Sequence, residues 1–142
     1  MQGQQFNAFS RSATLLPLMK LMIVDDHAGM RKKIRELLAR PNVEIREYTT
    51  GEDAVHSAYT FQPDWIIMDV HLPGVNGIEA TKAIRPAVPR ARIVVISTEE
   101  RRYLREAARE AGAEEFLSKS HLAELPQMLY GGPTGLPAWQ HE

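Results

Sequence analysis

Short apolar runs, each separated from the next by an amphipathic stretch, constrain the fold of this 142-residue chain more than any other feature. Four of these runs are too short to be helices and are typical of buried strands: 21–24, 65–68, 93–96 and 116–117. In a fifth segment, 43–49, Val43 and Ile45 alternate with charged residues, which indicates a strand at the edge of a sheet. Strands that alternate with helices predict an α/β fold with a parallel sheet.

Amphipathic segments between these runs predict helices, the first of them over 28–40, where apolar residues recur on one helical face. Further helices are predicted over 52–61, 77–85, 99–111 and 121–130. We expect Pro86 to stop the third helix and Gly112 to end the fourth. Ser120 is expected to cap the last helix, and Pro126 to kink it. Five strand–helix units of this kind predict a doubly wound parallel sheet with helices on both faces.

The length of the chain and its regular alternation of apolar runs and amphipathic segments indicate one folded domain. Residues 19–130 contain all the predicted strands and helices. Residues 1–18 lack their periodicity and are interpreted as a flexible leader. Residues 131–142, rich in glycine and proline, are interpreted as an irregular tail.

The composition excludes several classes of protein. A formal net charge of -1 provides no field that would draw the chain to nucleic acid or to anionic lipid, so direct nucleic-acid binding is not expected. The absence of cysteine excludes disulfides and thiolate metal sites, and it suits the cytoplasm. The apolar runs are far shorter than the roughly 20 residues of a membrane span, so no membrane insertion is expected.

Polar side chains stand where four of the predicted strands end: Asp25, Asp26, Asp69, Ser97 and Lys119. The first two follow the first strand, and the others follow the third, fourth and fifth strands in turn. Parallel strands joined by right-handed crossovers place their carboxyl ends at one edge of the sheet, where ligands bind. We therefore expect these side chains to line one crevice.

Three carboxylates in one crevice need a cation, because like charges about 4 Å apart repel by roughly 1 to 4 kcal/mol per pair. Oxygen ligands with positions left for water suit Mg²⁺. A metal ion, an ammonium, a hydroxyl and a carboxylate nucleophile are the parts needed for phosphoryl transfer to an aspartate. In this hypothesis Asp69 attacks phosphorus to form an acyl phosphate beside the Lys119 ammonium, and the carboxylates hold Mg²⁺.

Four segments resemble the signature segments of response-regulator receiver domains. They are VDDHAGMRKKIRELL at 24–38, IIMDVHLPGVNGIEA at 66–80, IVVIST at 93–98 and EEFLSKS at 114–120. The resemblance covers about residues 19–130 and keeps the five strand-end residues in the family's order and spacing. It implies a flavodoxin-like, doubly wound sheet of five strands in the order 2-1-3-4-5, and a place in a two-component His-Asp phosphorelay.

The resemblance also implies a role for each residue of the crevice. Asp69 matches the phosphoacceptor, which takes its phosphoryl group from a histidine kinase or a phosphotransfer protein. Asp25 and Asp26 match the acidic pair that binds Mg²⁺ together with Asp69. The backbone carbonyl of His71 completes the protein's share of the metal ligands, and Lys119 matches the family's lysine. The kinase and the output partner themselves are not specified by the resemblance.

Two further positions match the family's switch. Ser97 matches the hydroxyl residue that moves toward the phosphoryl group, and Phe116 matches the aromatic residue that moves with it. Three residues depart from the commonest pattern: Ser97 replaces threonine, Phe116 replaces tyrosine, and Ser120 stands where proline often follows the lysine. His27 together with Ser97 is similar to receivers fused to helix-turn-helix output domains. Because only about twenty residues follow Lys119, we expect a stand-alone or an excised receiver.

One alternative keeps the fold and drops the chemistry: a receiver-like interaction domain that docks on a partner, or forms a homodimer, without phosphate. An enzyme is not expected, because an aspartyl-phosphate phosphatase would need a second acid where His71 stands. An FMN-binding flavodoxin is not expected either, because the acidic loop 25–30 would repel the cofactor's phosphate. In the family, His71 and Glu99 flank the path of the water that hydrolyses the acyl phosphate, although both are also interpreted as solvent-facing.

Overall fold

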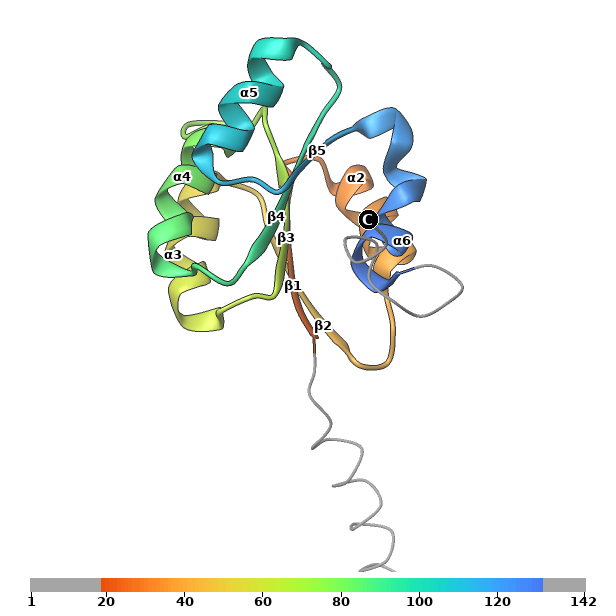
Figure 1. The fold of residues 1–142 in the computed structure, drawn as a ribbon. Helices are drawn as coiled ribbons and strands as arrows, with labels where there is room; N and C mark the ends of the chain where they lie inside the picture. The colour runs from red at the N-terminus through yellow and green to blue at the C-terminus, as the bar shows by residue number, and fades with distance from the viewer. Residues whose placement is uncertain (1–18, 132–142) are drawn as a thin grey trace, which may run out of the picture.

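The computed structural model describes residues 19–131, and at its centre lies a five-stranded parallel sheet (Figure 1). The strands are β1 (Met19–Val24), β2 (Val43–Tyr48), β3 (Trp65–Asp69), β4 (Arg92–Ser97) and β5 (Glu115–Ser118). Their order in the sheet is β2-β1-β3-β4-β5. All five predicted strands are present, and the doubly wound fold with strand order 2-1-3-4-5 is confirmed.

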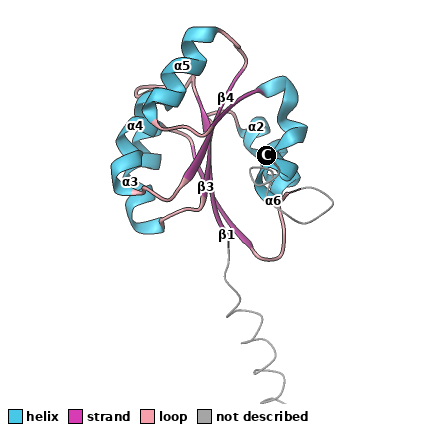
Figure 2. Ribbon diagram, viewed as in Figure 1, coloured by secondary structure: helices cyan, strands magenta, loops and turns pink. Residues whose placement is uncertain are grey.

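Helical segments connect the strands in the alternation that the sequence predicts (Figure 2). They are α2 (Ala28–Leu38), α3 (Gly51–Phe61), α4 (Gly77–Ala87), α5 (Arg102–Ala111), the 3₁₀ helix η1 (Lys119–Glu124) and α6 (Leu125–Tyr130). As expected, Gly112 ends α5, with a φ of 111° in the left-handed region that favours glycine. The connections leave the carboxyl ends of all five strands at one edge of the sheet.

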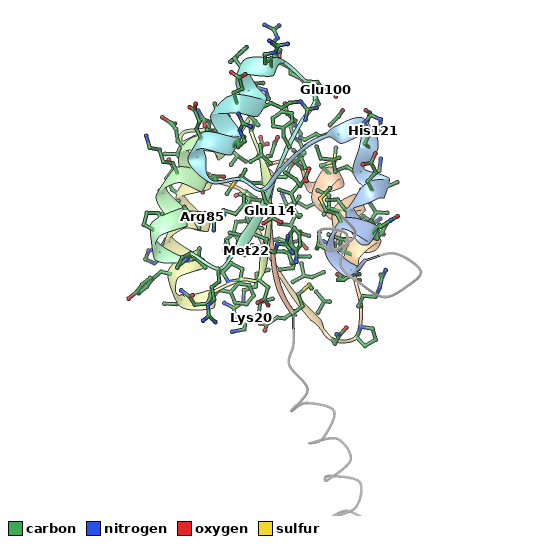
Figure 3. The ribbon with its side chains drawn as sticks, in the orientation of Figure 1. Lys20, Met22, Arg85, Glu100, Glu114 and His121 are labelled. Carbon is green, nitrogen blue, oxygen red and sulfur yellow. The ribbon has the colours of Figure 1, made fainter. Side chains whose placement is uncertain are left out.

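Helices cover both faces of the sheet, α3, α4 and α5 on one side and α2 and α6 on the other (Figure 1). Alternate residues of each strand contribute to the two apolar clusters that result. In β1, Met22 (labelled in Figure 3) belongs to the cluster that includes residues of α3, α4 and α5, whereas Ile23 belongs to the cluster that includes residues of α2 and α6. Because both faces are covered, the central strands are apolar at nearly every position.

Helix α4 ends later than the sequence predicts, because Pro86 does not stop it at residue 85. The helix continues to Ala87, and the Val88 N–H still donates to the Ile84 carbonyl. The Arg85 guanidinium also donates to four carbonyls beyond the helix, among them those of Ala91 and Gly112, both at 2.6 Å. A proline in the last turn is tolerated because few helical hydrogen bonds remain to be lost there.

The last helical segment also differs from the prediction. Ser118 rather than Ser120 acts as the cap, since the Ser118 hydroxyl accepts a hydrogen bond from the Ser120 N–H (3.2 Å). The chain then forms η1, with non-helical backbone angles at His121, before α6 begins. Pro126 lies in the first turn of α6, where a missing N–H costs nothing, and so it does not kink a helix interior.

Most of the predicted leader and tail lie outside the described residues. Only residue 131 of the proposed tail belongs to the described part, so the boundaries at 18 and 131 stay predictions. Within residues 19–131, no helix has the length and apolar character that crossing a membrane requires.

Candidate functional site

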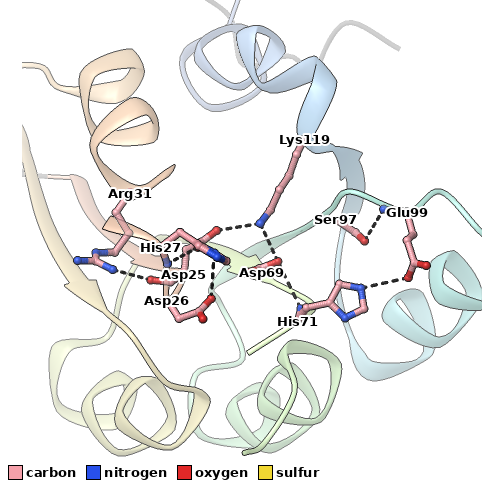
Figure 4. Close-up of polar contacts among 9 residues, drawn as sticks. All are labelled: Asp25, Asp26, His27, Arg31, Asp69, His71, Ser97, Glu99 and Lys119. Carbon is pink, nitrogen blue, oxygen red and sulfur yellow. Dashed lines mark hydrogen bonds and ion pairs between the residues drawn. The ribbon is translucent and has the colours of Figure 1, made fainter. Parts of the chain in front are cut away.

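The structure brings the predicted strand-end residues together at the carboxyl edge of the sheet (Figure 4). Asp25 follows β1, and Asp69 ends the neighbouring strand β3. The order of the sheet reverses between these two strands, because the chain passes from β1 outward to β2 and returns to β3. Such a switch point leaves room for a ligand between two loops that diverge.

Lys119 connects the two buried carboxylates. Its Nζ lies 3.1 Å from Asp25 Oδ2 and 3.1 Å from Asp69 Oδ1. Both aspartates are buried, and the lysine side chain is only 10 % exposed. Burial acts to lower the pKa of Lys119, but the charges of Asp69 and Asp25 outweigh it and raise the pKa above its ordinary value. Lys119 is therefore an ammonium at neutral pH.

The surroundings of Asp69 disfavour its charged form, whereas those of Lys119 favour its charged form. Burial raises the pKa of its carboxyl, the charge of Asp25 raises it further, and Lys119 lowers it without restoring the ordinary value. One oxygen, Oδ1, contacts Lys119 and accepts a hydrogen bond from the His71 N–H (3.3 Å). The other, Oδ2, is buried and has no hydrogen-bond partner among the residues that the structure describes. A further positive charge would stabilise this carboxylate.

The loop after β1 is held in shape by hydrogen bonds between side chains and its backbone. The His27 N–H donates to Asp25 Oδ1 (2.8 Å), and Arg31 Nη1 donates to the Asp25 carbonyl (2.8 Å). Asp26 is the most accessible of the three carboxylates, with 34 % of its side chain exposed. The His27 ring lies beside the carboxylates of Asp25 and Asp26. Its Nδ1 is 3.4 Å from Asp25 Oδ1 and 3.3 Å from Asp26 Oδ1.

The donor set fits a divalent cation. Asp25, Asp26, His27 and Asp69 each offer a ligand atom, and these atoms all lie within 4.8 Å of one another. Three carboxylates face a single ammonium, so the pocket carries an excess of negative charge. The unpartnered oxygen of Asp69 is a buried acceptor of the kind that a metal or a phosphoryl group satisfies.

Gly77 allows α4 to begin directly against the end of β3. A Cβ at this position would lie 1.9 Å from the Asp69 carbonyl oxygen, so no other residue fits without moving the backbone. The start of α4 is then secured by a capping box, in which Asn76 and Glu79 exchange hydrogen bonds. The loop that carries His71 is therefore short and closely packed against the end of β3.

The two predicted switch residues lie on neighbouring strands. Ser97 is fully buried, and its hydroxyl accepts a hydrogen bond from the Glu99 N–H (2.9 Å). Phe116 is 9 % exposed in β5, with the Arg105 guanidinium 5.0 Å from its ring centroid. Arg105 therefore separates the ring from solvent on the α5 side.

Several contacts around the site had no signal in the sequence. Arg31 Nε lies 3.1 Å from Glu47 Oε1, so that α2 and β2 are joined beside the acidic loop. His71 Nε2 lies 3.1 Å from Glu99 Oε1, a contact between the loops after β3 and β4. These pairs join distant segments, and only the folded chain places them side by side.

The fold and the pocket together define a doubly wound α/β domain with an acidic ligand site at the switch point of its sheet. The response regulator receiver domain model matches residues 21–130, and the chain belongs to this family. It is thus a receiver domain of the kind found in two-component systems, as its resemblance in sequence predicts.

Curated relatives agree with this assignment. The chain is 36% identical over 102 residues to the DNA-binding transcriptional activator EvgA of Escherichia coli K12, covering 71% of this chain and 50% of EvgA. It is 35% identical over 101 residues to the chemotaxis protein CheY of Thermotoga maritima, covering 70% of this chain and 84% of CheY. The chain thus spans about half the length of EvgA and most of CheY.

A solved structure shows the same fold. The two-component response regulator of the LuxR family from Aurantimonas sp. SI85-9A1 has a TM-score of 0.71 at 34% identity, covering 78% of this chain and 81% of that one. Together these relatives support the phosphorelay class, and the phosphorylation-independent alternative is not favoured.

Proposed function

We propose that Asp69 is the phosphoacceptor of this receiver and that a histidine kinase or a phosphotransfer protein is its donor. The observation that carries the proposal is the state of the Asp69 carboxylate. One oxygen is held by Lys119 and by the His71 N–H, while the other is buried without a hydrogen-bond partner in the described part of the chain. A carboxylate with one oxygen oriented and the other free is arranged as a nucleophile.

In the proposed step, Asp69 Oδ2 attacks the phosphorus of a phosphohistidine. The new bond joins carboxylate oxygen to phosphorus, the phosphorus–nitrogen bond breaks, and the departing imidazole takes up a proton. Lys119, which already lies 3.1 Å from Oδ1, stabilises the charge on the phosphoryl oxygens. Asp25, Asp26, Asp69 and the His71 carbonyl would hold Mg²⁺, which supplies positive charge against the same oxygens.

Phosphorylation of Asp69 would change the conformation of a partner-binding surface. We propose that the Ser97 hydroxyl leaves the Glu99 N–H for the phosphoryl group, and that Phe116 moves toward the space that Ser97 gives up. The movement biases the surface of α5, β5 and α6 toward a second conformation with a different affinity for its partner. The partner is a separate protein or a fused output domain, and the site of action is the cytoplasm.

Labelling with a small phosphodonor tests the proposal. The chain is incubated with acetyl phosphate and MgCl₂, and intact mass is measured beside an Asp69→Asn control. We expect one phosphoryl group in the wild type, removable by hydroxylamine as an acyl phosphate, and none in the variant. Labelling that survives hydroxylamine, or that persists in Asp69→Asn, would overturn the assignment.

A further inference from the structure

We propose that His27 contributes a nitrogen ligand to the acidic pocket, so that this receiver binds imidazole-preferring divalent metals such as Zn²⁺ and Cu²⁺ more tightly than Mg²⁺. The inference rests on the metal site of the proposed function and extends it from an oxygen-only site to a mixed nitrogen and oxygen site. As a consequence, the divalent metals available to the protein determine which cation occupies the pocket. The ability of Asp69 to accept a phosphoryl group then depends on that cation.

The His27 ring is directed at the carboxylates and not at its own helix. His27 occupies the N-cap position of α2, where a side chain commonly accepts a hydrogen bond from the first turn, yet its ring makes no such bond. Its Nδ1 lies instead 3.3 Å from Asp26 Oδ1 and 3.4 Å from Asp25 Oδ1 (Figure 4). The backbone N–H of His27 is already bound to Asp25 Oδ1, which fixes the position from which the ring projects.

These separations match those of ligands that share a metal. Ligands bound at about 2.1 Å lie roughly 3.0 Å apart when adjacent in an octahedron and roughly 3.4 Å apart in a tetrahedron. The ligand atoms of Asp25, Asp26, His27 and Asp69 all lie within 4.8 Å of one another. Small side-chain rotations therefore bring the imidazole into the coordination sphere.

A second observation, the surroundings of Asp69, supports a cation site in this pocket. Asp69 is 1 % exposed, and its Oδ2 has no hydrogen-bond partner within residues 19–131. Lys119 pairs with Asp25 and Asp69, so one positive charge faces two of the three carboxylates and none of it is bound to the third. The nearby cation Arg31 does not make up the deficit, because its guanidinium is engaged by Glu47 and by the Asp25 carbonyl.

The imidazole changes the choice of metal. Mg²⁺ prefers oxygen ligands and gives up its water reluctantly, so a nitrogen donor adds little to its binding. Zn²⁺ and the other later divalent metals bind imidazole well. The His27 ring is 74 % exposed, so it reaches the metal without any change in the core.

Calorimetric titration of the untagged full chain with MgCl₂ and ZnCl₂ tests the proposal. We expect Zn²⁺ to bind more tightly than Mg²⁺ in the wild type. In His27→Asn, which keeps a good N-cap residue, the Zn²⁺ affinity should fall about ten-fold or more, while the Mg²⁺ affinity stays nearly constant. His56→Ala, which removes an exposed imidazole from α3, should change neither affinity.

Pulsed electron paramagnetic resonance of the chain loaded with one equivalent of Cu²⁺, a paramagnetic ion that binds imidazole well, provides a direct readout. Modulation from a coordinated imidazole nitrogen should appear in the wild type and in His56→Ala and disappear in His27→Asn. Absence of this modulation in the wild type would overturn the proposal. So would a Zn²⁺ affinity that does not depend on His27, or equal losses of Zn²⁺ and Mg²⁺ affinity in His27→Asn.

The same variant separates this inference from the proposed function. If Mg²⁺-dependent labelling of Asp69 persists while the Zn²⁺ affinity is independent of His27, only the nitrogen ligand is wrong. If labelling fails in the wild type while His27 still determines the Zn²⁺ affinity, the metal site stands and the phosphoacceptor role is wrong.

Discussion

Asp69 lies at the centre of the site, and the fold places its carboxylate where a negative charge is costly. Burial and the charge of Asp25 raise the pKa of Asp69, and Lys119 offsets only part of this rise. The cost is acceptable because the same features make the carboxylate reactive toward an electrophile that arrives with a cation. The phosphoacceptor that we propose therefore works against stability when no cation is bound.

This balance predicts a stabilising substitution. A carboxyl whose folded pKa is raised contributes stability below its ordinary pKa of 3.8 and loses it as the pH rises through the folded value. Asp69→Asn should therefore raise the free energy of unfolding at pH 7 without added metal, by about 1 kcal/mol or more. The gain should vanish below the ordinary pKa, where Asp69 is protonated in both states.

Urea unfolding followed by circular dichroism across this pH range measures the effect. Asp64→Asn is a matched control, because Asp64 is exposed at the opposite end of β3 and an asparagine carbonyl can still accept the hydrogen bond that the Lys20 N–H donates. A destabilised Asp69→Asn at pH 7 would contradict the electrostatic account.

At the level of elements, the acidic loop depends on a contact between α2 and β2. Arg31 donates from Nη1 to the Asp25 carbonyl at 2.8 Å and pairs through Nε with Glu47 at 3.1 Å. Arg35 also pairs with Glu47, one turn further along α2. Of these two arginines, Arg31 is the one that donates to the loop, so it is a positioning residue for the carboxylates that would bind the metal.

Replacing Arg31 should therefore weaken metal binding. We expect Arg31→Met to lower the affinity for Mg²⁺ about ten-fold, as the loss of an outer contact to a metal site commonly does. Arg35→Met removes a partner of Glu47 but no bond to Asp25, and it should leave the affinity nearly unchanged. Calorimetric titration with MgCl₂ compares the two variants, and equal losses would show that the Glu47 pairing matters and the Asp25 contact does not.

At the level of the whole molecule, the pocket exists only in the folded chain. Asp26 and Asp69 belong to the ends of β1 and β3, which the sheet brings together although they are distant in sequence. A ligand that binds the folded state alone stabilises it by mass action. The metal binding that we propose at this edge would thus be coupled to the stability of the folded chain.

Added Mg²⁺ should accordingly stabilise the protein. At a concentration one hundred times the dissociation constant, we expect the free energy of unfolding to rise by about 2.7 kcal/mol. Asp26→Asn should lose most of this gain. Urea titrations at several MgCl₂ concentrations, matched in ionic strength with NaCl, provide the measurement; an equal gain in Asp26→Asn would mean that the ion acts elsewhere.

The sequence was sufficient to predict the strands, the class of fold and the residues at the strand ends. Apolar runs such as 93–96 carry the period of a buried strand, and polar residues such as Asp69 and Lys119 mark where those runs stop. The rule that parallel strands share a carboxyl edge then groups these residues without any coordinates. Helix ends were predicted less well, because the last turn of α4 accommodates Pro86 and because Ser118, not Ser120, takes the cap position of η1.

Only the tertiary structure decided which atoms meet at the site. Lys119 bridges Asp25 and Asp69, Arg31 reaches Glu47, and the His27 ring turns toward the carboxylates and away from its helix. A linear pattern encodes periodicity and burial, since these depend on near neighbours. It does not encode the side-chain directions and distances that determine charge balance and ligand choice, because those arise from packing between segments far apart in the chain.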